Sequence, residues 1–380
     1  MRVALRRVQV KSAGWREPLQ SLRRRMDVLT LDGSYGEGGG QILRTALSLS
    51  AVTMRPFYLT NIRLGRRNPG ILPQHLSAVR AAATISGATV SGDRLGSTEL
   101  CFTPSHPPKA GSYVFDVAET AERGSAGSVS LILQTLLVPL ALSDRGSTLL
   151  LRGGTHVEWS PSYDYLANAY FPALRRIGFR IDAELRRWGW YPVGNGEICC
   201  EIGIDRGAAR LNPIQVLDRG PLRQVTGTAI AANLPAHIPQ RMADRARVSL
   251  EGLGVPVNIL PQRITAACPG AGIFLVAGYE NMAASFSAYG RLGKPSEAVA
   301  DEAVAALRDH HTSIGAVELH LADQLLLPLS LSAGISTFTT PRPTGHLITN
   351  AWNIGQFAVA DISVEQGRPC RVSIQPHHWR

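Results

Sequence analysis

Three stretches of the chain share one pattern of polar and apolar positions. Each opens on a polar residue, continues with leucines and small residues, and closes on leucine alternating with serine or alanine. They align without gaps over residues 41–50, 134–143 and 323–332. Apolar segments of this length favour buried helices. We therefore predict three related helices that begin at Gln41, Gln134 and Asp323.

The spacing of these helices indicates repeats. The first two lie 93 residues apart, and the second and third lie 189 apart, close to twice that interval. The simplest interpretation is three similar repeats, the third interrupted by an insertion of comparable size. Leucine-rich helices also resemble one another by chance. Pro139 and Pro328, however, occupy the same position of the second and third copies, and proline is uncommon inside a helix.

Each repeat is predicted to hold a second helix that leads towards a strand. These helices span residues 73–85, residues 163–177, and a segment from His346 to just before Phe357. Further strands are predicted at residues 28–31, 197–202 and 272–277, and a further helix at 296–309. The alternation indicates an α+β fold in which each repeat pairs a sheet with helices on one face.

The same spacing predicts the domain organisation. A repeat domain comprises residues 27–216 and 316–380, and an inserted small α/β domain comprises residues 217–315, entered near residues 218–220. Residues 1–26 form a basic N-terminal extension with two open interpretations. It is either a disordered tail or sequence upstream of a natural start at Met26.

Net charge favours a nucleic-acid partner less than it first suggests. The chain carries a formal charge of +10, but the N-terminal extension alone accounts for +7. Only +3 is left for the remainder, so binding of RNA must be argued from particular arginines.

Composition excludes several functional classes. No apolar run reaches the roughly 18 residues of a membrane span. The five cysteines are scattered without CxxC spacing, so we predict neither a zinc site nor a disulfide framework, which fits a reducing compartment. The three lysines lack a KxDG context, and Pro295 follows Lys294. A ligase-type lysine nucleophile and a P-loop are therefore excluded.

A glycine-rich loop and three arginines are the first candidate site residues. Glu37 lies among five glycines at a helix start, where a carboxylate suits a metal ion that bridges to phosphate. The alternative is a tight turn with a helix-capping acid. Arg44, Arg63 and Arg66 suit phosphate recognition. The alternative for each is a solvated surface charge.

One glutamine and two histidines complete this set. Gln134, polar within an apolar run, suits a base edge or a ribose; otherwise it is a core amide. His75 and His346 each precede leucine at the start of a second helix, so equivalent positions are predicted to face a shared cleft. The alternative is a purely structural histidine. Surface positions are predicted for His310, His311, His377 and His378.

Together these motifs resemble the RNA 3′-terminal phosphate cyclases. The resemblance runs from about Leu29 to the C-terminal strand. The motifs occur in order at residues 36–44, 63–66, 74–76, 124–128 with Gln134, 153–155, 191–192, 320–324 and 346. It implies three βαβαββ repeats like the C-terminal domain of translation initiation factor 3, with an inserted α/β domain of thioredoxin-like topology.

The resemblance also implies a reaction. A histidine attacks ATP to give a histidine–AMP adduct, AMP passes to an RNA 3′-phosphate, and the 2′-hydroxyl closes a 2′,3′-cyclic phosphate. His346 matches the nucleophile. Positions that match ATP-binding residues are Gln134, His320, Leu321, Ala322, Asp323 and Gln324. Residues that match positions for the phosphates or the RNA end are Arg44, Arg63, Arg66 and His75, and Glu37 matches a position for Mg²⁺ or Mn²⁺.

The sequence departs from the family pattern at a few positions. Asn195 stands where a glycine is usual, Asn68 replaces a frequent basic or small residue, and His320 stands where relatives often have an aromatic residue. The implied partners are ATP and RNA with a 3′-phosphate end, without a membrane, in the cytoplasm. A homodimer is one option for assembly.

Two alternatives belong to other classes. Cyclase-like factors of ribosome assembly share the fold, bind RNA and lack the nucleophilic histidine, whereas this chain retains His346. Enolpyruvyl transferases have related repeats, but their chemistry calls for lysines that are nearly absent here.

Overall fold

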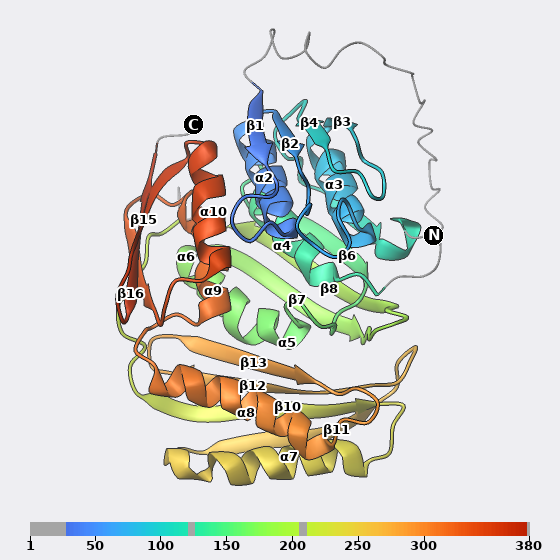
Figure 1. Ribbon diagram of the computed structural model, residues 1–380, viewed down its shortest axis with the longest axis vertical. Coiled ribbons are helices and arrows are strands. Elements are labelled where there is room, and N and C mark those ends of the chain that lie inside the picture. Colours follow the sequence, from blue (N-terminus) through green and yellow to red (C-terminus); the bar gives the residue numbers. More distant parts are fainter. Residues whose placement is uncertain (1–27, 121–125, 205–210, 378–380) are drawn as a thin grey trace.

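The computed structural model describes residues 28–120, 126–204 and 211–377. The predicted N-terminal extension, part of the motif at 124–128, and His378 lie outside these ranges. Within them the chain is a mixture of helices and small sheets, as the sequence predicts (Figure 1). No helix in the described ranges is long and apolar enough to cross a membrane.

Three of the sheets share one strand order. In each, the first two strands in chain order are parallel and the last two are antiparallel to their neighbours. The first sheet has the order β1 (Leu29–Asp32), β2 (Phe57–Thr60), β4 (Leu100–Thr103), β3 (Thr89–Ser91). The second has the order β5 (Ser112–Asp116), β6 (Ser147–Gly153), β8 (Gly196–Ile204), β7 (Phe179–Arg187). The third has the order β9 (Gln215–Val216), β14 (Ser336–Thr340), β16 (Cys370–Pro376), β15 (Ala360–Glu365).

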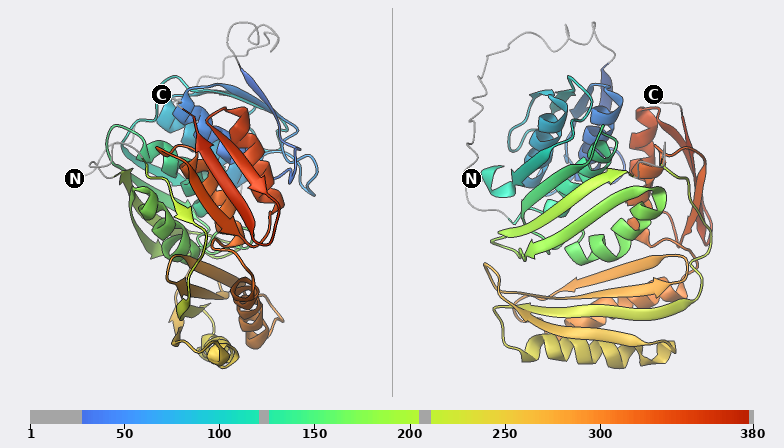
Figure 2. Two further views of the ribbon diagram at one scale, coloured as in Figure 1. Left: turned by 90° about the vertical axis from the view of Figure 1, so that its left-hand side faces the viewer. Right: turned by 180° about the vertical axis from the view of Figure 1, so that it is seen from behind.

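Helices accompany each of these sheets. The first unit has α2 (Gly40–Thr53) and α3 (Pro73–Ser86). The second has η1 (Val117–Thr120), α4 (Val129–Ala141), and a helical run made of α5 (Tyr163–Tyr165), η2 (Leu166–Tyr170) and α6 (Phe171–Ile177). The third has α9 (Leu319–Leu329) and α10 (Gly345–Gln356). One apolar core joins all three units, with the sheets towards the outside (Figures 1 and 2).

Two predicted helix starts are wrong. The helices α4 and α9 begin at Val129 and Leu319, so Gln134 and Asp323 lie in their second turns rather than at their first residues. Packing extends α4, because Val129 and the apolar residues after it are buried. A cap extends α9, because the Glu318 carboxylate accepts hydrogen bonds from the first backbone N–H groups.

The prolines inside these helices have a structural consequence. Pro139 has no N–H to donate to the carbonyl of Thr135 one turn earlier. The Ser48 hydroxyl of α2 donates to that carbonyl instead, at 2.7 Å. A proline in α4 therefore creates a polar contact that fastens α2 to α4.

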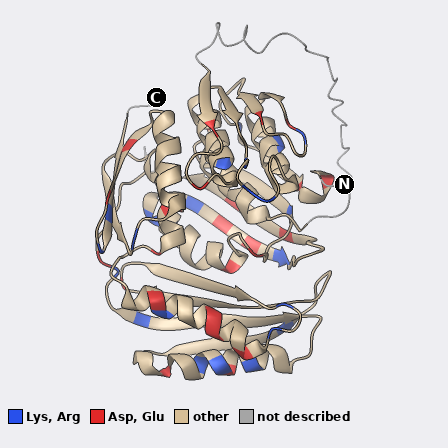
Figure 3. Ribbon diagram, in the orientation of Figure 1, with Lys and Arg blue, Asp and Glu red and all other residues tan. Residues whose placement is uncertain are grey.

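A fourth sheet lies between β9 and α9 in the sequence. Its order is β11 (Val257–Ile264), β10 (Leu222–Ala232), β12 (Gly270–Tyr279), β13 (Ala283–Tyr289). On one face it packs against α7 (His237–Leu250) and α8 (Ser296–Thr312), which are joined by ion pairs such as Arg241–Glu297 and Arg245–Asp301 (Figure 3). The short helix η3 (Glu251–Leu253) follows α7. On the other face, Phe274 and Ile230 pack against Trp190 of the second unit.

Arg219 joins the chain segments that enter and leave this sheet and its helices. Its guanidinium donates to the carbonyl oxygens of His310, His311, Ser313 and Gly315 at 2.7–3.0 Å. The predicted surface position of His310 is wrong: only 5% of this residue is exposed, because α8 turns it towards Tyr279 and Phe286.

Candidate functional site

The first turn of α2 is the meeting point of the candidate residues. There Gln41 donates through Nε2 to Asp323 Oδ2 of α9 at 2.5 Å. Its Oε1 lies 2.9 Å from Nδ1 of His346 in α10. The apolar core brings these helices together although more than 280 residues separate Gln41 from Asp323 in sequence. Gln41 was not among the predicted site residues; its alignment with Gln134 and Asp323 was the signal.

The contacts of Gln41 decide which nitrogen of His346 carries a proton. An ionised carboxylate only accepts hydrogen bonds, so when Asp323 is ionised the amide nitrogen of Gln41 faces Asp323 and its oxygen faces His346. That oxygen is an acceptor, so Nδ1 of neutral His346 must be the donor. The lone pair of His346 therefore lies on Nε2.

The surroundings of His346 favour its neutral form. The residue lies second in α10, beyond the cap in which Thr344 Oγ1 accepts from Leu347 N at 3.0 Å. Desolvation lowers the pKa of His346, and the positive charges of Arg44, His320 and Arg66 add to this, while Glu37 opposes it. The residue is nonetheless exposed, so its ring is open to a ligand.

His75 and Arg44 meet on the other side of the same turn. A Cβ atom at Gly40 would lie 2.2 Å from His75 Nε2 and 3.0 Å from Arg44 Nη1, so only glycine leaves room for both heads. Leu72 N donates to His75 Nδ1 at 3.2 Å, which leaves the proton on Nε2. Burial, aided by Arg44 and Arg63, lowers the pKa of His75 to about 3. His75 is thus a neutral donor at physiological pH.

Arg44 is a buried cation of the site. Burial lowers its pKa to about 10, although Asp323 opposes the shift, and the side chain is still charged at neutral pH. Within the described part of the chain its guanidinium forms no hydrogen bond or ion pair. A guanidinium in this state is suited to an anionic ligand.

Glu37 and Arg66 lie together beside the start of α10. Arg66 Nη2 donates to both Glu37 Oε1 and Glu37 O at 2.8 Å. The other carboxylate oxygen faces Gly345, whose added Cβ would lie 2.6 Å from Glu37 Oε2. The loop is fastened to α10 by Glu37 N, which donates to Thr349 Oγ1 at 2.9 Å.

Arg63 has a different local role from Arg66. Its Nη1 donates to the carbonyl oxygens of Asn68 and Gly70, at 2.7 and 3.1 Å, so it holds its own loop together. Burial and the charge of Arg66 lower the pKa of Arg63. The remaining guanidinium atoms can still face a ligand.

The start of α9 carries a charged histidine. Glu318 Oε1 lies 2.8 Å from His320 Nδ1 and raises the pKa of His320 to about 9. The exposed His320 is therefore an imidazolium at neutral pH. Leu321 and Ala322 are buried in the core, so of these two only backbone atoms can reach a ligand.

The last candidates form a second bridge between units. Gln134 Nε2 of α4 donates to Gln324 Oε1 of α9 at 2.7 Å. Beside it, burial raises the pKa of Asp323 to about 7. The helices α2, α4 and α9 are thus linked in pairs by amide side chains, Gln41 to Asp323 and Gln134 to Gln324.

Metal ligands from the protein are few. The described residues contain no group of three or more His, Cys, Asp or Glu side chains that could hold a metal ion. Glu37 offers a carboxylate close enough to His346 to oppose the lowering of its pKa. This fits Mg²⁺, which is usually held by one or two carboxylates together with substrate phosphates and water.

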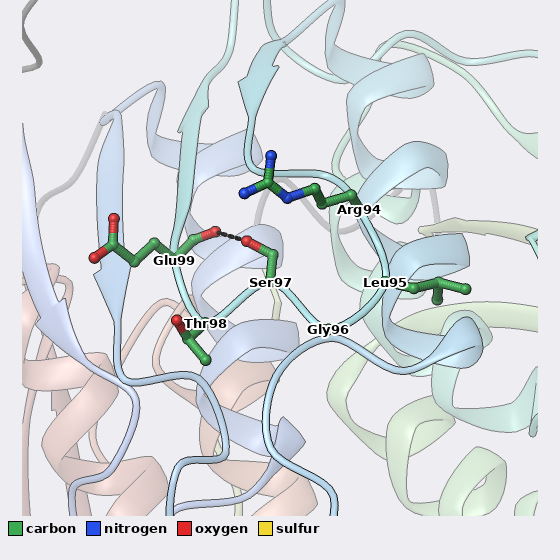
Figure 4. A pocket seen from close by; sticks show the side chains of 6 residues that line it. All are labelled: Arg94, Leu95, Gly96, Ser97, Thr98 and Glu99. Carbon is green, nitrogen blue, oxygen red and sulfur yellow. Dashed lines mark hydrogen bonds between the residues drawn. The ribbon is translucent and has the colours of Figure 1, made fainter.

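A separate shallow pocket lies on the first unit. It is lined by residues 94–99, with the Ser97 hydroxyl donating to Glu99 O at 2.7 Å (Figure 4). None of the candidate residues lines it, so we do not assign it to the site.

The site combines a neutral histidine that has a free ring nitrogen with cationic side chains and a neutral hydrogen-bond donor. This combination is typical of enzymes that act on phosphate esters. The family model described as RNA 3′-terminal phosphate cyclase matches residues 35–364. The chain belongs to this family.

Three curated relatives illustrate the similarity. The RNA 3′-terminal phosphate cyclase of Methylococcus capsulatus is 50% identical over 339 residues, which cover 89% of this chain and 93% of the relative. That of Gloeothece citriformis is 48% identical over 337 residues, covering 89% and 95%. That of Ralstonia nicotianae is 41% identical over 345 residues, covering 90% and 95%.

Proposed function

We propose that this protein converts an RNA 3′-terminal phosphate into a 2′,3′-cyclic phosphate at the expense of ATP, through a histidine–AMP intermediate. The observation that carries the proposal is the contact between Gln41 Oε1 and His346 Nδ1. It holds an exposed, neutral imidazole in the tautomer whose Nε2 can attack phosphorus. The names of the curated relatives support the overall reaction.

In the first proposed step, His346 Nε2 attacks the α-phosphorus of ATP. A nitrogen–phosphorus bond forms, the bond from that phosphorus to the bridging oxygen breaks, and pyrophosphate leaves with the electron pair. The charges of Arg44 and Arg66 offset the negative charge of the phosphates. Gln41 accepts the Nδ1–H of the imidazolium that develops on His346.

In the later steps the adenylyl group activates the RNA end. A 3′-phosphate oxygen attacks the adduct, so a phosphorus–oxygen bond forms and the bond to His346 breaks. The 2′-hydroxyl oxygen then attacks the 3′-phosphorus, AMP leaves, and the hydroxyl proton passes to solvent. In this proposal the His75 Nε2–H and the Arg44 and Arg63 guanidinium groups bind oxygens of the 3′-phosphate.

The remaining roles are proposed from position. The ATP site comprises Gln134, Gln324 and Asp323 side chains, the His320 imidazolium, and backbone atoms of Leu321 and Ala322. Glu37 would hold Mg²⁺ or Mn²⁺ together with the phosphates, and the ion would supply charge neutralisation.

Adduct formation is the decisive test. Incubation with α-labelled ATP and Mg²⁺ is expected to give an acid-labile labelled protein. The label should be absent in His346→Asn, and retained in His237→Ala, which removes an exposed histidine of α7. A wild-type protein that binds RNA but never acquires label would refute the enzyme in favour of a cyclase-like assembly factor.

We also propose the finer architecture that the resemblance implies. The first three sheets with their helices correspond to βαβαββ repeats, and the strand order of the fourth sheet supports a thioredoxin-like insertion over residues 217–315. The repeat domain then comprises residues 27–216 and 316–380. Cytoplasmic location and homodimer formation stay predictions.

A further inference from the structure

Two aromatic side chains of the second unit are left in solvent. Trp159 is 97% exposed and Tyr191 is 76% exposed. They lie on adjacent loops, because His156 and Trp190 form a bridge between the two backbones. Large aromatic side chains are usually buried for most of their area, so this pair needs an explanation outside the core.

The backbone conformation of Trp159 also requires an explanation. Its φ angle is +63°, in the left-handed region that bulky residues rarely adopt. Such a conformation costs free energy and persists only where the surroundings impose it. Almost no protein surface covers the Trp159 ring, so packing of the ring does not offset the free-energy cost of this backbone conformation. The residue is therefore a candidate for a function in ligand binding.

The two loops stand on a rigid base. His156 is fully buried, and its Nε2 lies 2.7 Å from Asp164 Oδ2. Its ring stacks on Trp188, with centroids 4.2 Å apart, and meets the edge of Phe274 from the fourth sheet. A base of this kind holds the exposed rings in place before a ligand arrives, which limits the entropy lost on binding.

The Trp159 loop is connected to the proposed active site through the start of α4. The Ser130 hydroxyl in the first turn of α4 donates to Pro161 O at 2.5 Å. Ser128, just before α4, donates through its N–H to Gln74 Oε1 at 3.3 Å, and Gln74 precedes His75. On the other flank, burial raises the pKa of Tyr165, and the nearby charges of Glu318 and Asp323 add to this shift, so Tyr165 lies close to the start of α9.

Two arginines lie at the base of the Tyr191 loop. Arg152 and Arg187 both contact one carboxylate, Glu197, at 2.8 and 3.3 Å. The hydrogen bond to Glu197 raises the pKa of Arg152, and the nearby charges of Asp116 and Glu119 add to this effect, so carboxylates balance the arginines here. The exposed aromatic rings are therefore the part of this surface that suits single-stranded RNA, because unpaired bases stack on such rings.

We propose that Trp159 and Tyr191 stack against unpaired nucleobases of the RNA just upstream of its 3′-phosphate end. The proposal rests on the function proposed above and adds a binding surface for the substrate strand. Because every base has a flat face, the surface would accept any sequence but would require a single-stranded end.

The test is a matched series of single-stranded oligonucleotides with 3′-phosphate ends. One abasic nucleotide is placed at each of the first several positions from the end, and KM for RNA is measured for wild type, Trp159→Ala and Tyr191→Ala. We expect each alanine variant to raise KM about tenfold on the intact strand. When the abasic nucleotide falls at the position whose base stacks on the substituted ring, the alanine variant should not raise KM further, because that base is already missing.

Three controls make the outcome decisive. Trp159→Phe and Tyr191→Phe keep a ring and should bind RNA nearly as wild type does, and Leu292→Ala removes an exposed apolar side chain elsewhere. Histidine–AMP formation without RNA should be unchanged in every variant, so its loss in wild type would refute the proposed function instead. Unchanged KM for RNA, or a raised KM for ATP in Trp159→Ala, would overturn the stacking surface.

Discussion

Three histidines of one site differ in charge because their neighbours differ. His75 is neutral because it is buried beside arginines, and His320 is charged because Glu318 binds it. His346 is neutral mainly through desolvation, and Gln41 selects its tautomer. The same residue type thus supplies a donor, a cation and, in the proposed reaction, a nucleophile, and each assignment can be tested by changing a neighbour.

Replacing Gln41 by leucine should slow adduct formation without abolishing it. The variant removes the acceptor for His346 Nδ1–H and leaves that donor unsatisfied. We expect the single-turnover rate of adenylylation to fall about 10- to 100-fold. The measurement uses labelled ATP at saturation, and the urea midpoint checks folding. A rate equal to that of wild type in a folded variant would show that Gln41 does not set the tautomer.

The pH dependence of adduct formation should respond to the charges around His346. In the proposed reaction only neutral His346 attacks, so the rate should fall as pH drops through its pKa. Glu37 raises that pKa, so Glu37→Gln should lower it and move the acid limb to lower pH. Arg66 lowers the pKa, so Arg66→Gln should move the limb to higher pH.

The measurement is the adenylylation rate between about pH 5 and 8, where histidines titrate. Both variants are expected to be slower than wild type, so the position of the limb is the informative quantity, not the height of the profile. Shifts in the same direction for both variants would contradict the assignment of this limb to His346.

At the scale of elements, contacts between helices compensate for local defects. Pro139 leaves the Thr135 carbonyl without its helical donor, and Ser48 of α2 supplies one. Asn353 of α10 donates to Ile42 O of α2 at 2.9 Å. Such bonds fix how the helices of different units sit against one another, and therefore where Gln41 meets His346.

The compensation at Pro139 can be measured as a coupling. Ser48→Ala should lower the free energy of unfolding by about 1–2 kcal/mol, because a buried carbonyl loses its donor. In a Pro139→Ala background the helix supplies an N–H at that position, so the same change should cost about 1 kcal/mol less. Urea unfolding of the four variants gives the coupling.

Ser86→Ala is the matched control, because that hydroxyl donates to Ala82 O, which already has a helical partner. Its effect is expected to be smaller than that of Ser48→Ala. Strict additivity of the Ser48 and Pro139 changes would exclude the compensation.

At the scale of the whole molecule, the fourth sheet with its helices is attached through the apolar cluster around Trp190 and through polar contacts where the chain enters and leaves it. Arg219 binds four carbonyl oxygens where the chain leaves α8, and its guanidinium lies 4.9 Å from the centre of the Tyr279 ring. A cation is also favoured at the end of a helix, where the carbonyl groups are unpaired. Arg219 therefore joins the entering and leaving segments in one place.

Arg219→Ala should destabilise the protein by about 3 kcal/mol, since several carbonyl groups lose a charged donor at once. Arg241→Ala is the matched control, because its ion pair with Glu297 is exposed and should contribute at most about 1 kcal/mol. Thermal and urea unfolding measure both. Equal effects of the two changes would show that Arg219 is only another surface charge.

Much of the fold follows from local pattern. Apolar runs predicted α2, α3, α8 and α10 to within a few residues, because the burial of an apolar face requires a fixed period in the sequence. The starts of α4 and α9 were missed because buried apolar residues and the Glu318 cap extend the helices beyond the shared polar position. The surface position predicted for His310 was wrong because the rings that cover it, Tyr279 and Phe286, come from strands β12 and β13 and not from its own helix.

The sequence by itself determined the residue types of the site, their order, and the family, because the residues of motifs such as 36–44 are consecutive in the chain. Only the tertiary structure decided that Gln41 lies between Asp323 and His346, and hence which nitrogen of His346 is free. The physical reason is that tautomer, pKa and unpaired charge depend on partners hundreds of residues away. Those partners meet only when the three helices pack into one core.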